Sequence, residues 1–327
     1  MVYCRPHLRS GPRPDGALAL GGGALWFAQA DLLSRGGGAE VVAASALPSG
    51  VRERFTVPRG DTGPALMGIL NTTPDSFSDG GQFNALDAAV ARAVEMVAQG
   101  ADIIDIGGES TRPGAQYVDV AEEINRTAPV IAALRAGGVS VPISIDTRKA
   151  QVAEAALQAG ATHLNDVSAL THDPFMSRVA SKFGVPVCLM HAQGDPATMQ
   201  QNPDYDDVLF DVFDHLEQRI CAAEGAGIDR SRIIIDPGIG FGKTQAHNMR
   251  LLRNIAVFHG LGCPILLGVS RKKFIGTLTG VARAEDRVMG SVAIALDAVA
   301  QGVQVLRVHD IEAHRQALAM WRALHGT

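Results

Sequence analysis

The chain lacks the features that mark membrane-spanning, disulfide-stabilised and nucleic-acid-binding proteins. No stretch approaches the roughly 20 apolar residues that a membrane span needs. The net charge is −5, so there is no basic surplus for non-specific binding to nucleic acid or to a membrane surface. The four cysteines are far apart and form no C-x-x-C pair, which is typical of free thiols in a reducing compartment. We therefore expect a cytoplasmic protein.

The beginning of the chain has some features of a signal peptide. The apolar run 17–28 follows several arginines, and Ala28-Gln29-Ala30 has the small-x-small pattern of a cleavage site. Three consecutive glycines at 21–23 interrupt this run, however, and disfavour the helix that a signal peptide forms. We interpret residues 1–60 as an N-terminal extension with one or two short strands, packed on the outside of the main domain. Its role is not readable from the sequence.

From residue 65 onward, strand-like and helix-like segments alternate. Eight alternations over about 260 residues predict a (β/α)8 TIM barrel, which is an α/β fold, over residues 61–327. A doubly wound open sheet usually has fewer strands. The strand-like runs are 66–70, 102–106, 141–145, 163–165, 185–190, 232–235, 264–267 and 303–308, and the helix-like segments include 85–99, 149–159, 205–224, 286–301 and 311–324.

Polar residues follow the last apolar residue of every predicted strand. In a parallel barrel these positions share one catalytic face, so a barrel without a site would not be expected to show the pattern. The residues are Asn71; Asp105 and 107–114; Asp146, Thr147 and Arg148; Asn165 and Asp166; His191 and Gln193; 236–243; 270–273; and Arg307, His309 and Asp310.

These side chains fall into two chemical groups. Asp146, Asn165 and Asp236 accept hydrogen bonds and suit a neutral heterocycle with amide and amine edges. The second group consists of donors that suit an anion, with Asn71 placed to help hold a hard cation beside it. Together the groups predict a ligand that is heteroaromatic at one end and phosphorylated at the other. The donors are Arg112, Arg271, Lys272, Arg307 and His309.

Eight motifs in this order resemble bacterial dihydropteroate synthase, a pterin-binding barrel family, over residues 65–325. Any one of them is weak evidence, but eight in the right order, each at a predicted strand end, are highly specific. They are MGILNTTPDSFSDGG (67–81), DIGGESTRPGA (105–115), ISIDTRK (143–149), HLNDVSA (163–169), VCLMHAQGDPATMQ (187–200), IIIDPGIGFGKT (233–244), GVSRKKFIG (268–276) and RVHD (307–310).

The resemblance implies an enzyme of folate biosynthesis that joins 7,8-dihydropterin-6-ylmethyl diphosphate to 4-aminobenzoate and releases pyrophosphate. It implies a Mg2+ cofactor near Asn71, small-molecule substrates, inhibition by sulfonamides and a homodimer. Loops 71–81 and 110–117 are expected to close over the site, with Thr72 to Gly81 as a mobile lid. The implied pterin residues are Asp146, Asn165, Met190, Asp236, Phe241, Gly268 and Lys272; the diphosphate residues are Asn71, Thr111, Arg112, Arg307 and His309; and the 4-aminobenzoate residues are Thr111, Pro113, Ser270 and Arg271. Of these, Asp146, Asp236, Lys272, Arg307 and His309 are expected to be catalytic.

The chemistry of the residues agrees with this reaction. An aromatic amine conjugated to a carboxylate is a poor nucleophile, so the reaction gains most from easy departure of the diphosphate. Arginines, an imidazolium and a divalent ion stabilise the charge that develops on the leaving group. The electron-rich pterin can spread the positive charge left on its methylene carbon, with Asp146 and Asp236 placed to stabilise it. We therefore favour an SN1-like substitution.

Two alternative functions are open at this point. A corrinoid-dependent pterin methyltransferase would share the pterin carboxylates but has no use for Arg112, Arg307 and His309. A non-catalytic relative would bind pterin without turning it over. The sequence also departs from many relatives at Ala192, where a methionine is common, and at Ile239, often a phenylalanine; we expect altered packing and no loss of reaction.

Three other features have plain structural explanations. Gly242-Lys243-Thr244 ends like a P-loop, but Pro237 stands where the first glycine is required and has no N–H for a phosphate. Asp105 and Glu109 are as easily explained by solvation, or by pairing with Arg112 or Arg148, as by a role in the site. His191 is equally compatible with a structural and a ligand role.

Overall fold

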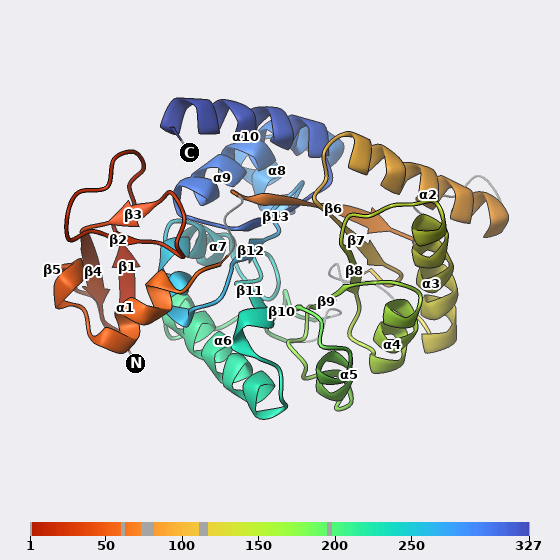
Figure 1. The fold of residues 1–327 in the computed structure, drawn as a ribbon, viewed down its shortest axis with the longest axis horizontal. Coiled ribbons are helices and arrows are strands. Elements are labelled where there is room, and N and C mark those ends of the chain that lie inside the picture. The colour runs from red at the N-terminus through yellow and green to blue at the C-terminus, as the bar shows by residue number, and fades with distance from the viewer. Residues whose placement is uncertain (1, 60–62, 73–81, 111–116, 195–197, 327) are drawn as a thin grey trace.

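The computed structural model describes residues 2–59, 63–72, 82–110, 117–194 and 198–326. Eight parallel strands form its main sheet, in the order β11-β10-β9-β8-β7-β6-β13-β12. A parallel bridge between Ile235 and Ile265 joins the two edges, so the sheet is a nearly closed barrel (Figure 1). The strands are β6 (Ala65–Asn71), β7 (Ile103–Gly107), β8 (Ile143–Asp146), β9 (His163–Asp166), β10 (Val187–Met190), β11 (Ile233–Asp236), β12 (Leu266–Leu267) and β13 (Val305–Val308).

Helices surround the barrel and cover the outer faces of its strands. Their apolar sides form the main core with the outward side chains of the strands, and a smaller cluster including Met67, Cys188 and Leu266 forms a second core. The predicted TIM barrel is confirmed. The helices are α2 (Gln82–Ala98), α3 (Val120–Ala136), α4 (Ala150–Gln158), α5 (Met176–Phe183), α6 (Val208–Gly225), α7 (Gln245–Leu252), α8 (Lys273–Thr279), α9 (Val288–Ala300) and α10 (Ile311–His325), with 3-10 turns η3 (Arg230–Arg232), η4 (Ile255–Leu261) and η5 (Glu285–Arg287).

Residues 2–59 form a small unit with its own core. A three-stranded antiparallel sheet in the order β1-β4-β5 lies beside the hairpin β2-β3 and helix α1. The unit thus has five strands and a helix, so the expectation of one or two strands was wrong. Its elements are β1 (Tyr3–Pro6), β2 (Leu18–Ala19), β3 (Trp26–Phe27), β4 (Gln29–Leu33), β5 (Ala39–Ala43), η1 (Ala44–Ala46) and α1 (Ser49–Thr56), and its core includes Cys4, Leu20, Phe27, Leu47 and Phe55.

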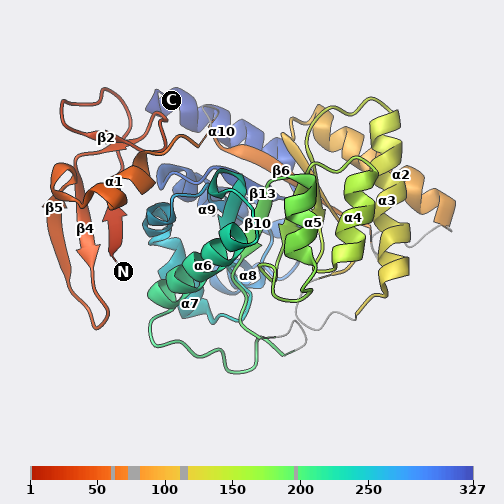
Figure 2. The same ribbon diagram turned by 60° about the horizontal axis from the view of Figure 1, so that its bottom comes forward.

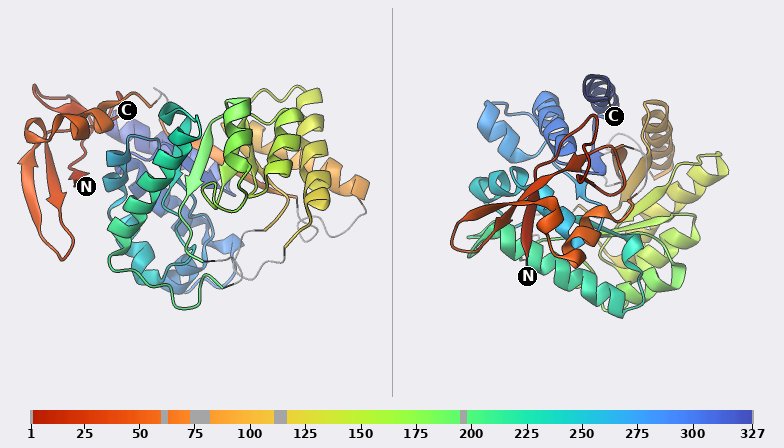
Figure 3. Two further views of the ribbon diagram at one scale, coloured as in Figure 1. Left: turned by 90° about the horizontal axis from the view of Figure 1, so that it is seen from below. Right: turned by 60° about the vertical axis from the view of Figure 1, so that its left-hand side comes forward.

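This N-terminal unit packs over the end of the barrel at which the strands begin, which we call the base (Figures 2 and 3). The Tyr3 ring lies 4.1 Å from the ring of Phe210 on α6, between ring centroids. Arg54 donates to Glu217 at 2.7 Å, again on α6. The unit therefore leaves the opposite end, where the strands finish, to carry the polar residues; we call that end the mouth.

No helix in the described part of the chain is long and apolar enough to cross a membrane.

Candidate functional site

A buried ion cluster lies at the centre of the mouth. Arg307, on β13, donates from Nε to Asp105 at 2.6 Å and from Nη2 to Asp146 at 2.8 Å. Asn165, on β9, donates to the same oxygen of Asp105 at 3.1 Å. Four strands thus bring four polar side chains together, because neighbouring strands place residues of the same level side by side: Asp146 is the register partner of Asn165.

The cluster retains unused acceptors. One carboxylate oxygen of Asp105 and one of Asp146 are buried and make no hydrogen bond within the described chain. Burial raises the pKa of Asp146 to about 7, although Arg307 acts in the opposite direction. Burial alone would lower the pKa of Arg307, but Asp105 and Asp146 outweigh it and raise that pKa. Since buried polar groups normally have partners, these oxygens indicate that a ligand with N–H groups belongs here.

Asp236 and Lys272 form the neighbouring part of the site. A Cβ at Gly268 would lie 3.9 Å from a carboxylate oxygen of Asp236 and also 3.9 Å from the Arg307 side chain, so this glycine lies beside both of them. Burial raises the pKa of Asp236, against the effect of Lys272. Burial likewise lowers the pKa of Lys272 to about 8, against the effect of Asp236. The predicted pterin residues Asp146, Asn165, Asp236, Gly268 and Lys272 therefore lie close together at the mouth.

Two further predicted pterin residues lie beside this group. Met190 ends β10 and is buried, directly beside Asp236 in the register of the two strands. Phe241 follows β11, and Lys272 lies over its ring with Nζ 4.5 Å from the centroid. Lys272 also donates to the backbone carbonyl of Ile239. An apolar and an aromatic side chain beside a set of acceptors suit a flat heterocycle.

The residues predicted for the anion and for the amine substrate meet at the next strand ends. Ser270 Oγ lies 3.1 Å from the backbone N–H of His309 and 3.0 Å from Nδ1 of its ring. Arg271 forms a two-pronged ion pair with Asp310, with 2.9 Å from its Nε to Oδ2. Arg271 has a left-handed backbone, φ +60°, a conformation that non-glycine residues rarely adopt outside functional or tightly constrained sites.

The remaining predictions concern the first two strand ends. Asn71 ends β6 half-buried, and Thr72 donates from its backbone and its hydroxyl to the carbonyl of Gly107. Thr111, Arg112 and Pro113 lie outside the described residues, as does most of the expected lid, 73–81. Their assignments stay predictions.

The sequence alone was compatible with both a structural role and a site role for Asp105. Its side chain is completely buried, and its ionic partner among the described residues is Arg307. Arg148 pairs with Glu109 instead, and Arg112 lies outside the described residues. The available signal was a carboxylate within the apolar strand 103–107: such a residue is almost never fully buried unless it is paired. It belongs to the site as the group that holds Arg307 and Asn165.

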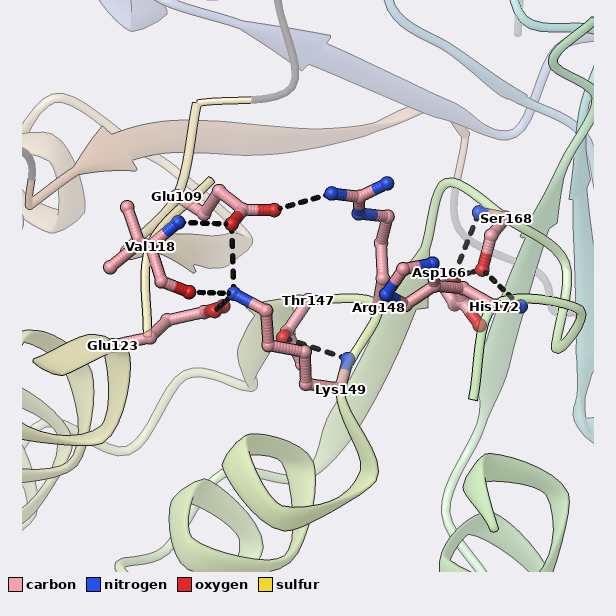
Figure 4. Close-up of polar contacts among 9 residues, drawn as sticks. All are labelled: Glu109, Val118, Glu123, Thr147, Arg148, Lys149, Asp166, Ser168 and His172. Atoms are coloured by element: carbon pink, nitrogen blue, oxygen red, sulfur yellow. Dashed lines mark hydrogen bonds and ion pairs between the residues drawn. The ribbon is translucent and has the colours of Figure 1, made fainter. Parts of the chain in front are cut away.

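Glu109, in contrast, belongs to a structural network (Figure 4). Arg148 donates to it at 2.8 Å, as one of the plain explanations predicted, and Lys149 Nζ lies 2.8 Å from its other oxygen. Lys149 also pairs with Glu123 of α3 at 2.6 Å and donates to the carbonyl of Val118. Burial acts to raise the pKa of Glu109, but its cationic and N–H partners outweigh this effect and lower it. The network fixes α3 and α4 beside β7 and β8.

The chemistry of the mouth offers a magnesium ion few protein ligands. Within the described residues, no three His, Cys, Asp or Glu side chains gather as a metal site. Mg2+ commonly takes only one or two protein ligands and completes its shell with water and substrate phosphates. The amide oxygen of Asn71 at the rim fits that pattern as a single ligand.

Comparisons with known proteins match the part of the chain that forms the barrel. The family model described as "Pterin binding enzyme" matches residues 67–309. A curated dihydropteroate synthase from Synechocystis is 48% identical over 261 residues, 79% of this chain and 90% of that protein.

Two solved structures are similar to the whole barrel. One is dihydropteroate synthase from Xanthomonas albilineans in complex with 7,8-dihydropteroate, with 46% identity, TM-score 0.74, and coverage of 81% of this chain and 95% of that one. The other is Yersinia pestis dihydropteroate synthase in a sulfonamide drug complex, with 45% identity, TM-score 0.75, and coverage of 80% and 94%.

Proposed function

This chain belongs to the dihydropteroate synthases among the pterin-binding enzymes, and we propose that it joins 7,8-dihydropterin-6-ylmethyl diphosphate to 4-aminobenzoate. The products are 7,8-dihydropteroate and pyrophosphate, which makes it an alkyl-group transferase of folate biosynthesis. The observation that carries this function is the buried cluster of Asp105, Asp146, Asn165 and Arg307, with carboxylate oxygens left free for a ligand.

The pterin ring would occupy the space between this cluster and Asp236. Its amine and amide N–H groups match the one free oxygen of Asp146 and the carboxylate of Asp236, and Lys272 would donate to its carbonyl oxygen. Met190 and Phe241 would lie against the ring. A ligand that supplies N–H donors relieves the cost of burying these carboxylates, since a buried acceptor without a partner is destabilising.

The diphosphate would lie toward Asn71, His309 and Arg307. Arg307 pairs with Asp105 and Asp146, beside the proposed pterin position. The same side chain would therefore contact both the heteroaromatic end and the diphosphate end of the substrate. A guanidinium at their junction would bind the oxygen between the pterin methylene and the phosphorus, where negative charge develops as the C–O bond breaks.

We favour an SN1-like path for the substitution. The carboxylates of Asp146 and Asp236 would stabilise the pterin-methyl cation, and 4-aminobenzoate would approach from the side of Ser270 and Arg271. When bound, Mg2+ would neutralise charge on the diphosphate, with Asn71 as its protein ligand. A secondary deuterium isotope effect at the methylene carbon, measured on kcat/KM, tests the path: a clearly normal effect is expected, and none would indicate direct displacement.

We further propose a cytoplasmic homodimer. Three of the four cysteines are buried free thiols, which suits a reducing compartment. Sedimentation at micromolar concentration tests the oligomeric state, and a single monomeric species would contradict it.

The deciding experiment follows pyrophosphate release by the purified protein with both substrates and Mg2+. Release that depends on 4-aminobenzoate is expected. No release above the uncatalysed rate, with the pterin substrate still bound, would favour the non-catalytic alternative. The corrinoid-dependent alternative has no support from the relatives above, which are named as synthases.

A further inference from the structure

Lys243 is a buried lysine that the reaction does not use. Its side chain is 3% exposed, and no described carboxylate lies within ion-pair distance of it. Its sequence context, Gly242-Lys243-Thr244, is that of an incomplete P-loop, yet its ammonium group points into the protein. A buried cation without a counter-ion is costly, so its contacts call for an explanation.

The ammonium group gathers acceptors from two strand ends. It donates to the carbonyls of Gly238 at 2.9 Å and Phe241 at 3.1 Å, both in the turn after β11. It also lies 2.8 Å from Nδ1 of His191 and 3.3 Å from the His191 carbonyl, just after β10. The side chain thus ties the turn 238–241 to the end of β10.

The turn is built for this close approach. Gly238 has φ +67°, and a Cβ there would lie 1.8 Å from the carbonyl oxygen of His191, so no other residue fits. Its N–H donates to Asp236 at 2.7 Å. The same turn carries Phe241 at its end and presents the Ile239 carbonyl to Lys272. The positions of Asp236, Phe241 and Lys272, which are predicted to hold the pterin, therefore depend on one turn.

We propose that Lys243 is a positioning residue for the pterin substrate: it holds the turn 238–241 against β10 and so sets Phe241 and Lys272 opposite Met190. This inference rests on the proposed function and deepens it. Without the ammonium group, two turn carbonyls and the His191 ring would lose their buried donor, and the turn would be free to move away from the pocket.

Lys149 provides a matched control. It is also 3% exposed, but its partners Glu109, Glu123 and Val118 belong to the network around α3 and touch neither Phe241 nor Lys272. Lys149→Met and Lys243→Met each remove one buried ammonium group and keep an unbranched, apolar side chain as far as Cε. Only the second is expected to act on the pterin.

The test measures binding of the diphosphate-free pterin alcohol by calorimetry, together with the KM for each substrate and thermal unfolding. We expect Lys243→Met to weaken pterin binding and to raise the KM for the pterin diphosphate about tenfold or more, while the KM for the amine substrate stays within about twofold of wild type. Lys149→Met is expected to lower the unfolding temperature while pterin binding changes less than about twofold.

Pterin binding by Lys243→Met within about twofold of wild type would overturn the proposal, and so would an equal loss in both variants. If Lys243→Met does not fold, Lys243→Gln replaces it. Its amide has two N–H donors and lies one atom nearer the backbone, so it cannot reach all four acceptors of the ammonium group. Weaker pterin binding is again expected, and unchanged pterin binding would overturn the proposal. If the wild-type protein binds the pterin alcohol but releases no pyrophosphate, the proposed function is refuted. The role of Lys243 is then decided by the comparison of pterin binding between the two variants alone.

Discussion

At the base of the barrel, Arg54 donates to Glu217 and Phe55 is fully buried. At the mouth, in contrast, Arg307 lies between Asp105 and Asp146, and each of these carboxylates keeps one oxygen without a partner among the described residues. The polar contacts of the base join the N-terminal unit to α6 and accompany apolar packing. At the mouth charged groups are buried, and this burial raises the pKa of Asp146 and of Asp236 against the effect of their cationic neighbours. One end of this barrel is therefore organised for stability and the other for a ligand, as is general for this fold.

The largest predicted effect is a difference in kcat/KM between substitutions of two arginines, one at the mouth and one at the base. Arg307→Ala removes the cation between the two carboxylates, and we expect kcat/KM for the pterin diphosphate to fall by about 10³-fold, as for loss of a charged transition-state donor. Arg54→Ala at the base should leave kcat/KM within about twofold of wild type. Steady-state kinetics on both variants measure this, and similar losses in both would end the distinction between the two ends.

A substitution in the apolar packing at the base should lower stability and leave activity unchanged. Phe55→Ala empties a fully buried site, and the free energy of unfolding should fall by about 3 kcal/mol, the cost typical of removing a buried aromatic ring. Activity well below the unfolding temperature should not change. Val41→Ala, at a position 58% exposed in the same unit, serves as the control in denaturant titrations. A loss no larger than that of the control would show that the unit adds no stability.

A third prediction concerns pH and sharpens the description of the mouth. The pKa of Lys272 is about 8, so its ammonium group loses a proton as pH rises through that value. If the charged form binds the pterin, kcat/KM should fall about tenfold per pH unit above this pKa. The free energy of unfolding should change in the opposite direction, because the pKa of Lys272 is higher in the unfolded chain. Between pH of about 8 and 10.4 the unfolded chain binds the proton more tightly than the folded chain, so the contribution of Lys272 to stability rises with pH.

Lys272→Arg provides the check on this pH dependence. Arginine stays protonated throughout the range, so the decline in kcat/KM should move to higher pH or vanish, whatever the absolute activity of the variant. An unchanged decline in Lys272→Arg would assign it to another group.

The smallest effect is expected from the exposed ion pairs of the base. Arg35 donates to Asp211 and Asp214, but its side chain is 41% exposed. Exposed pairs contribute little because water screens them, so Arg35→Ala should lower the unfolding free energy by at most about 1 kcal/mol. A larger loss, measured by denaturant unfolding beside Arg54→Ala, would mean that the base depends on its outer charges.

The barrel was predictable because its strands are buried on both faces and read as short apolar runs, such as 187–190 and 233–235, each followed by polar residues. Glu109 and Arg148 were also within reach, since their strands are adjacent along the chain. The Asp105–Arg307 pair was not, because 202 residues separate its members and only closure of the barrel brings them together.

The N-terminal unit shows a different limit. Its strands are two to five residues long and are separated by glycine-rich turns, so no periodic pattern extends far enough to be read. What stabilises them is contact between segments: Arg5 and Tyr3 bond to residues beyond position 200. The proposed role of Lys243 was hidden for the same reason: apart from the His191 ring, its partners are carbonyl groups, which every residue has.

The most direct test of the central claim is the stoichiometry of the reaction at the mouth, measured by quantifying pyrophosphate and 7,8-dihydropteroate in the same samples over time. The wild-type protein is predicted to form equal amounts of both products, and neither when 4-aminobenzoate is omitted. Pyrophosphate released without dihydropteroate, or no release of either in the presence of both substrates and Mg2+, would contradict the claim.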